Sequence, residues 1–156
     1  MNFSVVHLHL AINHSPLYTE LFALILMVIG MVRRNRTLIT SGLVVTVIAG
    51  LCAIAAAITG NGAADFIDHS PPIAGVDKMA IGEHDAAATY LLWAACITGG
   101  LAIIALWIGR KRERPRWVEM LVTIAILFSL TVVARVALLG GRIHHPEVRA
   151  VTGGPS

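Results

Sequence analysis

Histidine is the residue type in this chain that is best suited to chemistry. The 156 residues include seven histidines, which are His7, His9, His14, His69, His84, His144 and His145. Carboxylates stand beside two of these sites, because Glu83 and Asp85 flank His84 and Glu147 follows His145 closely. Imidazole is a ligand for haem iron and for copper, zinc or iron ions, and a nearby carboxylate can orient the ring or bind the metal itself. The residue types therefore indicate a haem or metal site, if the fold brings them together.

The composition places these residues in a membrane protein. Hydrophobic residues make up 56% of the chain and charged residues 13%, whereas a soluble domain carries about 25% charged residues. This balance excludes a disordered chain, a coiled coil and an ordinary water-soluble domain. The apolar residues instead fall in long blocks, and a helix needs about 20 such residues to cross a bilayer.

Four blocks are long enough, at about residues 16–32, 38–59, 85–109 and 117–139. Their polarity does not alternate as in a β-barrel strand, and a continuous apolar helix satisfies its own backbone in lipid. The sequence therefore predicts an all-α fold, an integral membrane up-down-up-down four-helix bundle over residues 16–140. Residues 1–15 are expected to form an interfacial segment, residues 60–83 a loop on the outer face, and residues 141–156 an outer-face tail.

Local signals set the expected helix ends. Ser15 followed by Pro16 is typical of a helix start, and Gly140 with Gly141 is typical of a helix end. No Lys or Arg precedes the first apolar stretch, so residues 1–15 do not read as a secretory signal.

Basic residues predict the orientation. Eight of the twelve lie around two short turns, namely Arg33, Arg34, Arg36, Arg110, Lys111, Arg112, Arg114 and Arg116. Basic short loops mark the cytoplasmic side. In a bacterial inner membrane this places both termini, and all seven histidines, on the periplasmic side. Nucleic-acid binding is not expected, because no extended basic face with aromatic platforms is present.

The predicted bundle also suggests which histidines meet. The first and third helices of such a bundle are diagonal and start at the same depth. His14 and His84 are therefore expected to face each other, as the two axial ligands of a b-type haem do. His145 or His144, and His69 from the loop, are alternative ligands.

Two charges lie inside the predicted spans, and such charges usually face the bundle interior. Glu20 lies near the start of the first span and Arg135 near the end of the fourth. One interpretation pairs these two residues. The other has Arg135, with Arg142, hold an anionic ligand such as a haem propionate or a quinone oxygen.

The stretches LHLAINHSP, EHD and GGRIHHPE resemble the motifs of a group of uncharacterised small bacterial four-helix integral membrane proteins. The matching residues are Asn13, His14, Pro16, Glu83, His84, Gly140, Gly141, Ile143, His145 and Glu147. The chain departs from that pattern at His144, where Arg is expected, so either His144 or His145 can be the functional residue. The resemblance implies a polar site on the outer face. The layout is also similar to four-helix cytochrome b-type membrane subunits, although those place their haem histidines inside the spans.

Three functions follow as expectations. The first is electron transfer by b-type haem near the periplasmic face, between the quinone pool and a periplasmic redox partner or subunit. The second is a copper, zinc or iron site built from His14, His84, His145 and one of Glu83, Asp85 and Glu147. The third is a cofactor-free subunit of a homo-oligomer or of a larger membrane complex, with histidines that respond to protons. No nucleotide-binding loop or nucleophile motif points to an independent enzyme.

Overall fold

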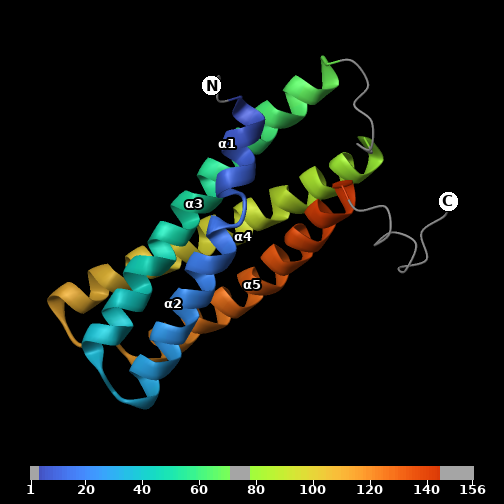
Figure 1. The fold of residues 1–156 in the computed structure, drawn as a ribbon. Coiled ribbons are helices and arrows are strands. Elements are labelled where there is room, and N and C mark those ends of the chain that lie inside the picture. The colour runs from blue at the N-terminus through green and yellow to red at the C-terminus, as the bar shows by residue number, and fades with distance from the viewer. Residues whose placement is uncertain (1–3, 71–77, 145–156) are drawn as a thin grey trace.

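The computed structural model describes residues 4–70 and 78–144. Within these ranges the chain is helical and contains no strand (Figure 1). The helices are α1 (Val5–Ile12), α2 (Ser15–Val32), α3 (Arg36–Asp68), α4 (Lys78–Lys111) and α5 (Arg116–His144). Four segments are long and apolar enough to cross a membrane, because α1 and α2 together count as one and α3, α4 and α5 supply the others.

The helices form a closed antiparallel ring. α2 packs against α3 and α5, and α4 packs against α3 and α5, while α1 packs against α3. The turns at residues 33–35 and 112–115 lie at one end of the bundle, here called the basic end (Figure 1). The start of α1, the end of α3, the start of α4 and the end of α5 lie at the other end, here called the histidine end. The predicted all-α up-down-up-down bundle is confirmed.

The core consists of small and aliphatic side chains, which allow the helices to approach closely. Near the basic end, Met27, Leu43 and Ile126 are fully buried. A second cluster towards the histidine end includes Ala53 and Ala87. Large apolar residues elsewhere on the helices are exposed, and they include Phe22, Trp93, Ile124 and Phe128. An apolar outer surface over apolar helices is suited to a lipid bilayer.

The helices extend further at the histidine end than the sequence predicts. α3 continues to Asp68 and α4 begins at Lys78, so the expected loop 60–83 is much shorter. His84 consequently lies inside α4 instead of opening it. α5 also passes through Gly140 and continues to His144. Packing explains these differences, because a Cβ on Gly60 would lie 3.1 Å from the His9 ring, and one on Gly140 would lie 3.1 Å from the His84 ring. These glycines provide close contact and do not end helices.

Most of the expected interfacial segment that the structure describes is helical. α1 is a helix whose N-cap Ser4 accepts a hydrogen bond from the backbone N–H of His7. Its junction with α2 is held by the Ser15 hydroxyl, which donates to the Ile12 carbonyl at 2.6 Å. α1 therefore continues from α2 alongside α3 (Figure 1). A location at the membrane surface for this segment stays a prediction.

Candidate functional site

His84 is held between α4 and α5. Its Nδ1 lies 3.1 Å from the carbonyl oxygen of Val136, and its ring lies against the backbone of Gly140. A carbonyl oxygen can only accept a hydrogen bond, so Nδ1 carries the proton and donates. In the neutral ring, Nε2 therefore carries the lone pair. A histidine whose Nδ1–H is held by a carbonyl in this way is typical of metal-binding sites.

His9 is held in a similar way between α1 and α3. Its Nδ1 lies 3.3 Å from the hydroxyl oxygen of Thr59. The same hydroxyl lies 2.9 Å from the Ala55 carbonyl oxygen and 3.1 Å from that of Ala56. When it donates its single proton to one of these carbonyls, its oxygen accepts from the His9 Nδ1–H. The ring packs over Gly60, as His84 packs over Gly140. In that arrangement the neutral His9 ring also presents a lone pair on Nε2.

These two histidines share the histidine end of the bundle. Both are half-buried, and they are close enough for a charge on His84 to act on His9. Val136, whose carbonyl binds His84, packs in the core cluster that contains Ala53 and Ala87. The candidate site formed by His9 and His84 therefore lies at the end of the hydrophobic core. Residues of α1, α3, α4 and α5 all contribute to it.

Sequence analysis did not single out His9, although a signal was present. The buried residues of α2 recur with a spacing of three and four, at Pro16, Glu20, Ala23, Met27 and Gly30. Traced backwards, the same spacing reaches positions 13 and 9. His9 thus falls on the stripe that faces the bundle when α1 is treated as an extension of α2.

His14 lies off this stripe and is exposed. Its ring is hydrogen-bonded to the side chain of Asn13 and stacked on Tyr18, with ring centroids 6.5 Å apart. These contacts belong to its own segment. Among the described histidines, His9 is the one on which a charge on His84 acts. The predicted pairing of His14 with His84 gains no support.

His69 serves a different purpose, at the end of α3. Its Nδ1 donates to the Asp65 carbonyl at 2.8 Å and lies 3.4 Å from the Asp65 carboxylate. The hydrogen bond to that carbonyl, and then the negative charges of Asp65 and Asp68, raise the pKa of His69. The ring is exposed, so these contacts cap the helix locally and do not bring His69 to the other histidines.

The remaining predicted ligands do not assemble within the part of the chain that the structure describes. The side chains of Glu83, Asp85 and Arg135 are exposed, and Arg142 is partly exposed. His144 is the last residue of α5. His145 and Glu147 lie outside the described residues. Among the side chains that the structure describes in residues 4–70 and 78–143, no three of His, Cys, Asp or Glu form a group that could hold a metal ion.

Glu20 has a partner other than the predicted one. Its side chain is 1% exposed, and the Ser129 hydroxyl donates to its Oε1 at 2.6 Å. Its Oε2 has no hydrogen-bond partner among the described residues. Arg135 is exposed and lies about 9 Å further along α5 at the rise of an α-helix, on a different face. The expected Glu20–Arg135 ion pair is therefore wrong, because the helix register places Ser129 at that depth.

Comparison with known proteins adds nothing to this geometry, because no family model, no curated protein and no solved structure matches the chain. The four-helix membrane-type fold is shown by the structure itself. The similarity to the small bacterial family and to cytochrome b-type subunits stays a prediction.

Proposed function

We propose that this protein is a multi-pass membrane electron carrier that binds b-type haem through His9 and His84. The supporting observation is that Nδ1 of each ring is held on a separate helix, at the Val136 carbonyl for His84 and at the Thr59 hydroxyl for His9. With the proton on Nδ1, Nε2 of each ring is the nitrogen with a lone pair. The two imidazoles would hold the haem iron through these nitrogens. When bound, the haem supplies reversible one-electron transfer.

The chain's own residues support this role in three ways. The Val136 carbonyl and the Thr59 hydroxyl orient the rings and make their free nitrogens better ligands. Gly60 and Gly140 leave space that a Cβ would fill, so each ring can lie against a helix backbone. Arg142 follows Gly140 closely on α5 and would supply a cation for a haem propionate.

The location of the site suggests which redox partners it meets. By the positive-inside rule the basic end is cytoplasmic, so in a bacterial inner membrane the histidine end faces the periplasm. We propose that electrons pass between the quinone pool and a periplasmic redox partner, or a partner subunit in a larger complex.

The test is the visible spectrum of the purified full-length chain, produced in cells that make haem freely. We expect a Soret band, with split α and β bands after reduction, and a stoichiometric haem content. His9→Ala and His84→Ala should each remove these bands, whereas His14→Ala and His69→Ala should retain them. A wild-type chain without a Soret band contradicts the proposal. Loss of the bands in His14→Ala with retention in His9→Ala would restore the pairing expected from the sequence.

A second candidate is a cofactor-free subunit, and one observation favours it. The same two rings tie α1 to α3 and α4 to α5 by packing on Gly60 and Gly140, which is also what structural histidines do. His84→Gln distinguishes the two functions, because the glutamine amide can still donate to Val136. If the role is only structural, this variant keeps the wild-type stability and no preparation absorbs in the Soret region. Metal analysis of the same samples tests the copper, zinc or iron alternative.

A further inference from the structure

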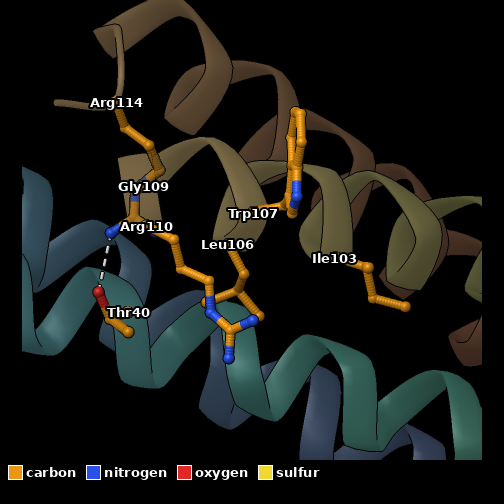
Figure 2. Close-up of a pocket in the computed structure, with 7 residues that line it drawn as sticks. All are labelled: Thr40, Ile103, Leu106, Trp107, Gly109, Arg110 and Arg114. Atoms are coloured by element: carbon orange, nitrogen blue, oxygen red, sulfur yellow. Dashed lines mark hydrogen bonds between the residues drawn. The ribbon is translucent and has the colours of Figure 1, made fainter. Parts of the chain in front are cut away.

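A groove of about 440 Å³ lies at the basic end, far from the histidines. Figure 2 shows its lining, which is formed by Thr40, Ile103, Leu106, Trp107, Gly109, Arg110 and Arg114. Two of these residues are cations and three are large apolar side chains. The groove runs between α3 and α4, so that charged groups at the end of the bundle continue into apolar groups along α4.

Arg114 is built into the wall of this groove. From the turn between α4 and α5, its Nη2 donates to the Thr40 hydroxyl on α3 at 2.8 Å (Figure 2). Its side chain is only 8% exposed. Gly109 makes room for it, because a Cβ there would lie 2.7 Å from Nη1. A guanidinium in this position is fixed before any ligand arrives.

The charge of Arg114 is only partly balanced. Its Nε lies 3.8 Å from the Glu119 carboxylate and makes no hydrogen bond with a described residue. Burial lowers the pKa of Arg114, the Glu119 carboxylate opposes this effect, and the positive charge of Arg36 adds to it. An anion in the groove would relieve both the loss of solvation and the repulsion from Arg36.

Arg110 adds a second cation on the open side. Its side chain is exposed and extends beside Leu106 towards α3 (Figure 2). Within the described residues it has no hydrogen bond or ion pair. Ile103 and Trp107 are 55% and 57% exposed, on the part of α4 that leads into the candidate span. The groove is therefore continuous with the exposed apolar surface of α4.

We propose that this groove binds the phosphate headgroup of an anionic phospholipid. Arg110 and Arg114 contact the phosphate, and the acyl chains lie along Ile103, Leu106 and Trp107. Arginine forms strong charge-assisted hydrogen bonds with phosphate, and basic pockets between membrane helices on the cytoplasmic side are suited to lipid headgroups. A soluble phosphate would use only the cationic half of the groove, which is why the apolar half favours a lipid.

The experiment is native mass spectrometry of the intact protein in detergent, with phosphatidylglycerol or phosphatidylcholine added. We expect one phosphatidylglycerol to be retained preferentially. Arg110→Gln should lower its apparent affinity roughly tenfold, the loss of one charge-assisted contact. Thr40→Val, which removes the hydroxyl that holds Arg114, should lower it as well.

Arg112→Gln is the matched control, because Arg112 is exposed in the same turn and does not line the groove. It should leave phosphatidylglycerol binding unchanged. An equal loss in Arg112→Gln, or equal retention of both lipids, would overturn the proposal, since only general charge attraction would remain. Displacement of the lipid by inorganic phosphate at millimolar concentration would show a soluble-anion site and would also overturn it. None of these results depends on haem.

Discussion

Ser129 donates a hydrogen bond to Glu20 at 2.6 Å, and both side chains are almost completely buried between α2 and α5. The contact joins two helices through a polar pair in an otherwise apolar bundle. An ionised carboxylate with one hydrogen bond is costly at such a depth. The pair therefore fixes how α2 and α5 sit against each other, because any rotation would leave a buried polar group without a partner.

Removal of the Ser129 hydroxyl should destabilise the protein. Ser129→Ala leaves both oxygens of Glu20 without a partner, and such a buried group costs about 1–3 kcal/mol. Glu20→Gln should be tolerated better than Glu20→Ala, since the amide keeps the volume and an acceptor for Ser129. Unfolding in a denaturing detergent, followed by far-ultraviolet circular dichroism, measures these changes. Ser41→Ala, on an exposed position of α3, is the control and should have no effect.

Gly42 should not accept a methyl group. An added Cβ would lie 2.9 Å from Met27 Cγ and 3.1 Å from the Met27 backbone nitrogen, so α2 and α3 would have to move apart. We expect Gly42→Ala to lower the free energy of unfolding by about 1–3 kcal/mol, the usual effect of overpacking. Gly100→Ala is the matched control, because nothing lies within 4 Å of its Cβ. If both variants were equally stable, the close α2–α3 contact would be in error.

Gly140 and Gly141 offer a paired test of the His84 cradle. A Cβ on Gly140 would lie 3.1 Å from His84 Cε1, whereas one on Gly141 meets nothing within 4 Å. Gly140→Ala should displace the ring from the Val136 carbonyl and, under the proposed function, reduce haem content or shift the α band. Gly141→Ala should keep the wild-type spectrum. Identical spectra in both variants would show that His84 does not hold the haem.

His69 should titrate above the ordinary histidine value of about 6.5. Its hydrogen bond to the Asp65 carbonyl, followed by the carboxylates of Asp65 and Asp68, raises its pKa in the folded protein. Its contribution to the end of α3 is therefore present below the unfolded value and is lost as the pH rises through the folded one. Histidine NMR measures the titration. Asp65→Asn should lower the pKa only in part, because the backbone hydrogen bond remains, and an unchanged pKa would argue against the charge contribution.

The end of α3 and the contacts of His9 are features that the sequence did not predict. α3 passes the glycines at positions 60 and 62 because α1 covers them, with Val5 packed against Gly62 and His9 against Gly60. Helix propensity is a property of one segment by itself, whereas the packing over these glycines comes from a different segment, α1. The contacts of His9 with Thr59 and Gly60 likewise form only because α1 packs on α3.

The sequence alone determined the four apolar spans, their antiparallel order and the gathering of arginines at one end. These features depend on the solvation of each segment by itself, so they can be read without neighbours. The tertiary structure decided that His9 reaches Thr59, that Glu20 meets Ser129 and not Arg135, and that Arg114 reaches Thr40. Successive residues of an α-helix point about 100° apart around its axis. Side-chain partners therefore depend on how neighbouring helices are rotated and shifted relative to each other, and only packing fixes this arrangement.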